Sequence, residues 1–215
     1  MNERATSKKG DIFIVDNSDA AWKVQKYLSE WCELSKKFDI ATGFFEIGSL
    51  LTLDQKWQNL EKIRILMGDE VSKRTQKAFE EGLENIASKL DDSIEREKEE
   101  NDFLEGVPAI VEGIRDNTIE CRIYRKKKFH AKAYITHSKF DVIGSAALVG
   151  SSNFTLPGLT ENIELNVQIK HEIEILQKWF EEHWKEAEDV TPDMLKTVER
   201  HVREYSPFDV YTKPS

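Results

Sequence analysis

The chain has 215 residues, of which 40 are acidic and 31 basic, so its formal net charge is −9. This length suits one sizeable domain, and the acidic balance excludes a protein that is basic over its whole surface; any nucleic acid has to meet a local basic patch. The two cysteines, Cys32 and Cys121, lie in unrelated contexts without a Cys-x-x-Cys, which gives no support for disulfide or zinc chemistry.

The N-terminus, residues 1–10, is polar and is predicted to be flexible. No apolar run approaches the roughly 18 residues that a membrane span needs. We therefore expect a cytoplasmic protein without a membrane contact. One domain is predicted over residues 11–205, followed by a linker or tail at 206–215.

Strands and helices alternate in the first half of the chain. Strands are predicted at 11–15, 38–45 and 62–68, and helices from Trp22 to Trp31 and over 46–60. This alternation is typical of a parallel sheet with crossover helices. We expect an α/β fold with a mixed, largely parallel β-sheet, helices on both of its faces and a helical C-terminal extension.

A long helical pattern with many acidic residues follows from Ser72 to Leu104. Such a charge run is usually a solvated helix face, and the alternative is a strut or lid that repels misplaced nucleic acid. A short second helix begins at Val107, with Pro108 tolerated in its first turn.

A strand predicted at 119–124 leads into a basic run. Between Arg115 and Lys139 there are eight basic residues and two acidic ones. In an acidic protein this reversal of sign predicts nucleic-acid binding, the alternative being a solvated turn. The residues predicted to bind are Arg125, Lys126, Lys127 and Lys128.

Three further strands are predicted at 129–135, 146–154 and 162–167. Residues two apart share a face of a strand, so His130 and Lys132 form one pair and Ser151 and Asn153 another. If these strands are neighbours, an imidazole, an ammonium, a hydroxyl and a carboxamide converge. Such a patch suits a phosphate, because it combines a nucleophile or proton carrier with donors for anionic oxygens.

Two helices are predicted at the C-terminal end. An apolar stripe from Ile173 to Trp184 predicts an amphipathic helix that packs on a core or a dimer partner. Thr191 and Pro192 predict the cap and first position of a last helix that extends to Arg203.

The order His130-x-Lys132, then Gly150-Ser151-Ser152-Asn153, then Glu164 resembles the H-x-K…G-S-x-N…E pattern of the phospholipase D superfamily. Residues 153–164 are similar to the branch found in restriction endonucleases and at the N-termini of bacterial DEAD/DEAH and SNF2-type helicases. The strand at 38–45 resembles the family's early strand, which borders the active cleft, and its Gly43 either allows close approach or relieves crowding.

One position departs from the family pattern. The family's Asp, five residues after the Lys, falls on His137 in this chain, and the nearest acid is Asp141. In the family that Asp lies to one side of the chemistry, so the change puts activity in question without excluding it.

The resemblance implies phosphodiester cleavage without a metal or another cofactor. His130 would attack phosphorus to give a phosphohistidine, while Lys132, Ser151 and Asn153 hold the non-bridging oxygens and Glu164 orients the His130 ring. No carboxylate cluster with the spacing of a hard-cation site accompanies the motif. Because only one H-x-K occurs in the chain, the second catalytic imidazole has to come from another subunit, which predicts a homodimer.

Two other functions stay open at this point. One is a non-catalytic module that binds nucleic acid, DNA rather than RNA, and delivers it to a downstream helicase domain beyond the 206–215 linker. The other is a phosphatidyl-transferring lipid enzyme, disfavoured by the single motif and the basic run. No Walker-type glycine loop is present, so this chain binds no ATP by that route.

Overall fold

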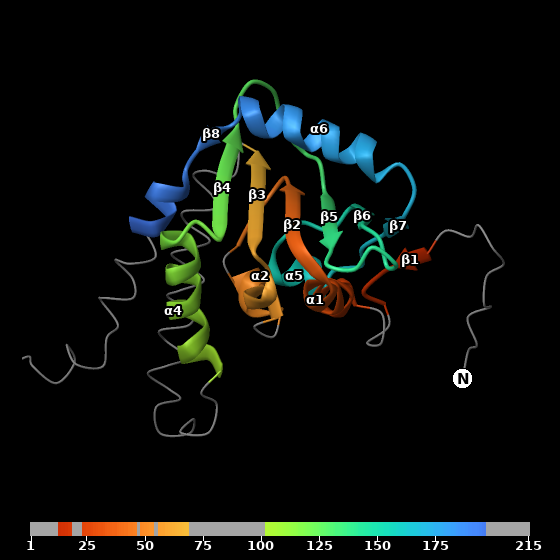
Figure 1. The fold of residues 1–215 in the computed structure, drawn as a ribbon, viewed down its shortest axis with the longest axis horizontal. Helices are drawn as coiled ribbons and strands as arrows, with labels where there is room; N and C mark the ends of the chain where they lie inside the picture. Colours follow the sequence, from red (N-terminus) through yellow and green to blue (C-terminus); the bar gives the residue numbers. More distant parts are fainter. Residues whose placement is uncertain (1–12, 19–22, 47, 54–55, 69–101, 197–215) are drawn as a thin grey trace, which may run out of the picture.

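The computed structural model describes residues 13–18, 23–46, 48–53, 56–68 and 102–196. The centre of this described part is an eight-stranded sheet with the order β1-β7-β6-β5-β2-β3-β4-β8 (Figure 1). Its strands are β1 (Phe13–Val15), β2 (Ser35–Thr42), β3 (Lys62–Gly68), β4 (Ile119–Tyr124), β5 (Ala133–Ser138), β6 (Ala146–Gly150), β7 (Asn166–Ile169) and β8 (Glu188–Asp189). The helices are α1 (Val24–Leu34), α2 (Gly48–Leu51), the 3-10 helix η2 (Lys56–Asn59), α4 (Asp102–Arg115), α5 (Leu156–Thr160) and α6 (Ile173–Glu186).

The fold is α/β with a mixed sheet, as predicted, but the prediction of a largely parallel sheet is wrong. Only β2 with β3 and β3 with β4 pair in parallel, and the other five strand pairs are antiparallel. A parallel pair needs a crossover of a dozen or more residues, whereas the link 139–145 between β5 and β6 is too short for one. The crossover pattern of the first half of the chain does not continue into the second.

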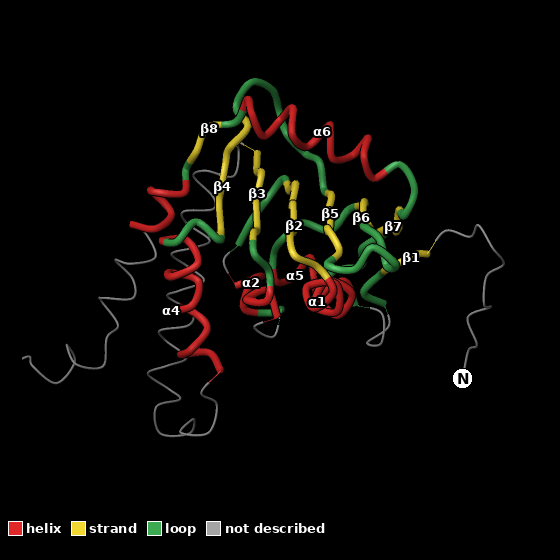
Figure 2. The backbone as a smooth tube through the Cα atoms, viewed as in Figure 1, coloured by secondary structure: helices red, strands yellow, loops and turns green. Residues whose placement is uncertain are grey.

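Helices cover both faces of the sheet, with α6 on one side and α1, α2, α4 and α5 on the other (Figure 2). Residues of β2 that face opposite sides of the sheet belong to two different hydrophobic cores. Phe38 and Ile40 belong to the core beneath α1, and Ala41 belongs to the core beneath α6 with Phe180. The central strands are therefore buried on both faces, which explains their continuous apolar sequences.

The segment from 125 to 132 forms no helix or strand, although the sequence predicts a strand from Phe129. Its two ends explain why: β4 and β5 are not neighbours, because β3 and β2 lie between them in the sheet. The segment has to pass over the ends of these two strands before it can join β5. His130 and Lys132 consequently lie at an edge of the sheet and not within a strand.

Other boundaries also differ from the sequence prediction. The helix predicted over 46–60 is two short pieces, α2 and η2, and the strand predicted from Asn162 begins at Asn166. Helix α4 begins at Asp102 and contains Pro108 in its interior, earlier than the predicted start. The amphipathic helix α6 is confirmed, and the last helix is described from Thr191 to Lys196.

Some of the predicted segments fall on residues that the structure does not describe. They are the polar N-terminus, the acidic pattern up to residue 101 and the tail from residue 197. Within the described ranges, none of the helices is both long and apolar enough to cross a membrane.

Candidate active site

The predicted site residues come from four strand ends that meet at one edge of the sheet. Strands β2 and β6 end at this edge, and β5 and β7 begin there, because each neighbouring pair among these four strands is antiparallel. The edge therefore gathers Gly43, residues 130–132, residues 151–153 and Glu164. Segments more than a hundred residues apart in sequence become neighbours.

Gly43 lies beneath three of the predicted site residues. A Cβ atom at Gly43 would be 3.3 Å from Asn153 Oδ1, 3.4 Å from Lys132 Nζ and 3.6 Å from His130 Cα. Two of the side chains predicted to hold phosphate thus meet above a residue that has no side chain. A glycine here keeps the space next to both of them open.

The orientation of Asn153 follows from its hydrogen bonds. Its Oδ1 accepts a hydrogen bond from Phe44 N, at 3.1 Å. A backbone N–H can only donate, so the oxygen of the amide faces Phe44 and its NH2 group faces the other way. Thr42 fixes the same loop, since its Oγ1 accepts from Phe154 N at 3.0 Å. Asn153 can therefore present N–H donors to an anionic oxygen.

Lys132 lies close to both His130 and the acid of the site. Its Nζ donates to the backbone oxygen of His130 at 3.0 Å. Partial burial lowers the pKa of Lys132 below its ordinary value, and the carboxylate of Glu164 acts in the opposite direction. His130 itself is exposed at the surface of this edge.

Ser151 and Glu164 are bound to each other. Ser151 Oγ donates to Glu164 Oε2 and accepts from Leu165 N at 3.0 Å, while Asn162 Nδ2 donates to Glu164 Oε1 at 3.3 Å. A hydroxyl carries one proton, so Ser151 cannot give that proton to a phosphate oxygen while it holds Glu164. The geometry gives Ser151 the task of fixing the carboxylate. The role of Glu164 toward the His130 ring stays a prediction.

His137, at the position of the family's Asp, lies at the opposite end of β5 from His130. Its Nε2 is 2.9 Å from Oδ2 of Asp39, a buried residue of β2. Asp39 also accepts hydrogen bonds from Arg64 Nε and Nη2, at 2.6 and 2.9 Å. The imidazole that replaces the family's Asp at position 137 therefore contacts a carboxylate on the neighbouring strand β2, and this contact lies away from the site.

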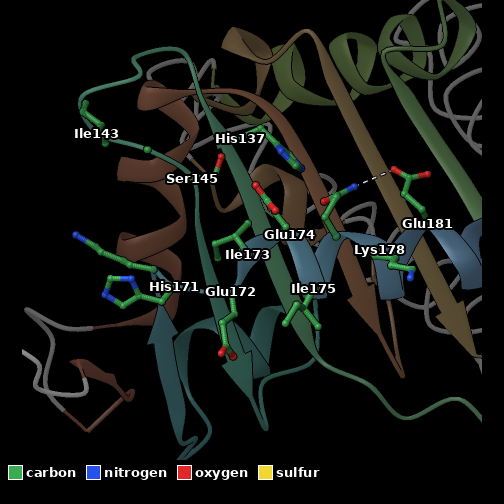
Figure 3. A pocket seen from close by; sticks show the side chains of 13 residues that line it. His137, Ile143, Ser145, His171, Glu172, Ile173, Glu174, Ile175, Lys178 and Glu181 are labelled. Atoms are coloured by element: carbon green, nitrogen blue, oxygen red, sulfur yellow. Dashed lines mark hydrogen bonds between the residues drawn. The ribbon is translucent and has the colours of Figure 1, made fainter.

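A groove of about 1050 Å³ lies beside His137, between the loop before β6 and the start of α6 (Figure 3). Ser145, His171, Glu172 and Lys178 are among its lining residues. None of the predicted site residues lines it. It belongs to the opposite edge of the sheet and has no part in the geometry around Gly43.

The four residues of the basic run are exposed just before His130. Arg125 Nε lies 3.0 Å from a carboxylate oxygen of Glu188, and Lys126 Nζ lies 3.1 Å from one of Glu186. Glu188 of β8 and Glu186 at the end of α6 thus pair with Arg125 and Lys126. The local positive charge is smaller than the sequence alone indicates.

Sequence reasoning missed two asparagines that fix the segment before β7. Asn17 Nδ2 donates to the backbone oxygens of Gly158 and Asn162, at 3.1 and 2.9 Å. Asn166 Nδ2 donates to Ser152 Oγ at 2.8 Å. The contacts of Asn17 join residues more than 140 positions apart, so no local pattern could have identified them.

No three side chains of His, Cys, Asp or Glu within the described ranges come together as metal ligands. The absence of a metal from the reaction stays a prediction that chelation can test.

A family model described as "Cardiolipin synthase, PLD-like domain" matches residues 32–184. NucT from Helicobacter pylori has 9% identity and a TM-score of 0.50, covering 83% of this chain and 98% of its own. The phospholipase D family member Nuc from Salmonella typhimurium has 13% identity and a TM-score of 0.49, covering 83% and 97%. Phosphatidylserine synthase from Haemophilus influenzae has 13% identity and a TM-score of 0.46, covering 94% and 48%. No curated protein sequence matches the chain. At 9% identity, the likeness to NucT speaks only for the fold.

Proposed function

This chain belongs to the family of phospholipase D-like domains, and we propose that it is a phosphodiesterase that cleaves nucleic acid. One observation carries the proposal: His130, Lys132 and Asn153 converge around Gly43, since a Cβ there would lie 3.6 Å from His130 Cα, 3.4 Å from Lys132 Nζ and 3.3 Å from Asn153 Oδ1. Lys132 supplies an ammonium donor and the NH2 group of Asn153, which faces away from Phe44, supplies a second, so a residue that can act as a nucleophile stands beside two donors for anionic oxygens.

The proposed reaction has two steps. A ring nitrogen of His130 attacks phosphorus, the bond to the leaving oxygen breaks, and a second imidazole gives that oxygen its proton. Water then attacks the phosphohistidine, the second imidazole takes a proton from that water, and the P–N bond breaks. Lys132 and Asn153 donate hydrogen bonds to the non-bridging oxygens, where negative charge develops. Ser151 and Asn162 hold Glu164, which orients the His130 ring.

Nucleic acid is the proposed substrate because the basic run, residues 125–128, is separated from His130 by Phe129 alone. Purified protein should be incubated with plasmid, single-stranded DNA, RNA and phospholipid vesicles, each with EDTA present. We expect cleavage of DNA, undiminished by the chelator. Release of lipid headgroups without DNA cleavage would replace this proposal by the phosphatidyl-transferring alternative, and loss of activity in EDTA would overturn the metal-free mechanism.

The second imidazole is proposed to come from a second copy of the chain. Of the other histidines in the described ranges, His137 and His171 line the groove at the opposite edge, and the Nδ1 of His183 is held by Trp179 O at 2.8 Å. Exposed apolar residues flank Glu164 in the sequence: Ile163 is 92% exposed and Leu165 is 60% exposed. A homodimer that buries them would bring two His130 residues together.

Replacing Ile163 and Leu165 together by Asp should therefore separate the dimer. We expect light scattering to give twice the chain mass of 24.9 kDa for the unmodified protein and the chain mass itself for the variant, with cleavage lost. The matched control replaces Val142 and Ile175, exposed apolar residues elsewhere, by Asp and should stay dimeric and active. An unmodified protein that is monomeric at micromolar concentration and fully active would rule out the shared site.

The two ion pairs of the basic run, with Glu186 of α6 and Glu188 of β8, offer a test of nucleic-acid binding. Replacing Glu186 and Glu188 by Gln releases Lys126 and Arg125 from their ion pairs, so affinity for DNA should rise. The dependence of log K on log salt should steepen by about 0.7–0.9 for each additional phosphate that the released cations neutralise.

The matched control for this change is the pair Glu174→Gln and Glu182→Gln, which alters the net charge equally and lies on α6, the helix of Glu186. Equal steepening in both double variants would mean that net charge alone acts, and the basic run would lose its assignment as the binding surface.

Membership of the restriction-endonuclease and helicase-associated branch is part of the proposal on the resemblance of residues 153–164 alone. It implies that a motor domain follows in the full protein. Detection of a helicase domain downstream in the same reading frame would support it.

A further inference from the structure

The segment 125–132 carries His130 and Lys132 but forms no helix or strand. A regular ladder of hydrogen bonds therefore does not fix it. Phosphoryl transfer nevertheless needs the nucleophile within a fraction of an ångström of its productive position. The packing of neighbouring side chains has to supply that precision.

The backbone of Phe129 rests directly on the end of β3. A Cβ atom at Gly68 would lie only 2.6 Å from the backbone oxygen of Phe129. The segment is thus supported from below by a strand end with no side chain in the way. Any displacement of His130 in that direction is blocked by backbone.

On its other side, Phe129 is held by an aromatic anchor, which we define as Tyr124, Phe129, Trp179 and His183. The Phe129 ring is 5.7 Å from that of Tyr124, 6.0 Å from Trp179 in a stacked arrangement, and 6.1 Å from His183. Its side chain is buried, with 8% of the residue exposed. Rings at these separations attract one another beyond simple burial.

The two α6 members of the anchor are themselves fixed. His183 lies 4.7 Å from the Trp179 ring and 5.2 Å from that of Tyr124. Its Nδ1 is 2.8 Å from Trp179 O, and a carbonyl oxygen only accepts, so Nδ1 is the nitrogen that donates. Tyr124 completes the connection, since its hydroxyl donates to Glu186 Oε2 at 3.2 Å.

We infer that Trp179 and His183 are positioning residues for His130. They hold Phe129, the residue that precedes it, and so fix the imidazole relative to Lys132 and Asn153. This inference rests on the proposed phosphodiesterase function. It assigns to α6 a part in the reaction, although the helix contributes no side chain to the site.

A positioning role predicts a specific kinetic effect. Misplacing the nucleophile weakens the transition state more than the bound substrate, so kcat should fall while KM changes little. We expect Trp179→Ala to lower kcat by about 10–100-fold, since a displacement of about 1 Å can cost that much. His183→Ala should act in the same direction, and Trp179→Phe, which keeps a ring against Phe129, should recover most of the rate.

The matched control is Phe180→Leu, on the same helix. Phe180 is fully buried and packs on Trp184 and Arg64, outside the anchor. It should lower stability while leaving kcat within about twofold of the unmodified protein. Equal losses of kcat in Trp179→Ala and Phe180→Leu would reduce the anchor to ordinary core packing and overturn the inference.

A second readout needs no activity. In the NMR spectrum of isotopically labelled histidine, the His130 Cε1–H signal should shift or broaden in Trp179→Ala and stay unchanged in Phe180→Leu. An unchanged His130 signal in Trp179→Ala overturns the positioning role even if the chain cleaves nothing. An unmodified protein that cleaves no phosphodiester, with the signal shifted as expected, would instead reject only the proposed function.

Discussion

His130→Ala should lower phosphodiester cleavage by about 10⁴-fold or more and leave nucleic-acid affinity within a few-fold of the unmodified protein. The imidazole forms a bond to phosphorus only during the reaction, whereas the contacts to bound phosphate come from Lys132 and Asn153. Single-turnover cleavage of labelled DNA gives the rate, and fluorescence anisotropy with the same DNA gives the affinity.

Two further variants separate the other roles in the same assays. Lys132→Ala should weaken both binding and rate, because its charge faces phosphate in the ground state and in the transition state. Glu164→Gln should leave a slower but active enzyme, since an amide still accepts from Ser151 while it stabilises an imidazolium less well.

The outcomes distinguish the competing functions. If His130→Ala cleaves as fast as the unmodified protein, the catalytic assignment is wrong. If neither protein cleaves and both bind, the chain is a non-catalytic nucleic-acid-binding module that retains the phosphate-holding residues.

The central strands could be predicted from the sequence because they are buried on both faces. Strands β3 and β4 have the bounds predicted for them, Lys62–Gly68 and Ile119–Tyr124. Their direction relative to the later strands could not be predicted, because it depends on which strands become neighbours. In this sheet β5 pairs with β2, which lies some ninety residues earlier in the chain.

The candidate site was accessible from the sequence only in its motif residues. His130, Lys132 and Asn153 stand in a recognisable order, but strand alternation is not what brings them together. They lie beyond the strand ends, and the segment that carries the first two crosses β3 and β2. The support from Asn17 and Trp179 depends on contacts between distant segments, and no local pattern encodes such contacts.

The ion pairs of the basic run likewise could not be predicted from a local sequence pattern. Arg125 and Lys126 form a strong local signal of positive charge, and their partners stand about sixty residues later, Glu186 at the end of α6 and Glu188 in β8. Sequence composition measures the charge of a segment. Only the fold determines how much of it is neutralised.

Asp39 is at the centre of a buried polar network beneath α6. It is fully buried and accepts two hydrogen bonds from Arg64 and one from Gln177 at 3.0 Å, and His137 Nε2 lies 2.9 Å from its Oδ2. Arg64 also donates a hydrogen bond to Glu181, and its Cζ lies over the Phe180 ring, 4.9 Å from the ring centroid. Removing the Asp39 carboxylate leaves the buried Arg64 guanidinium paired with Glu181 but without its buried ion-pair partner.

Asp39→Ala should therefore lower the free energy of unfolding by about 3–5 kcal/mol. The matched control is Glu120→Ala, which breaks the ion pair between Glu120 and Lys62. The side chain of Lys62 is 29% exposed and that of Glu120 is 28% exposed. A pair this accessible to water should contribute at most about 1 kcal/mol. Urea denaturation followed by circular dichroism measures both, and similar losses would show that the Asp39 network adds no more than a surface pair.

The pH dependence of stability gives an independent check on the same carboxylate. Burial acts to raise the pKa of Asp39, but the hydrogen bonds from His137 and Arg64 and the charges of Arg64 and Lys37 outweigh it, so the pKa lies below its ordinary value. The unfolded chain then binds this proton more readily than the folded one. Stability from Asp39 is complete above the unfolded pKa of about 3.9 and is lost as the pH falls through the lower folded value. Urea midpoints between pH 6 and pH 3 should fall more steeply for the unmodified protein than for Asp39→Ala, and parallel curves would mean that Asp39 is not the group that titrates.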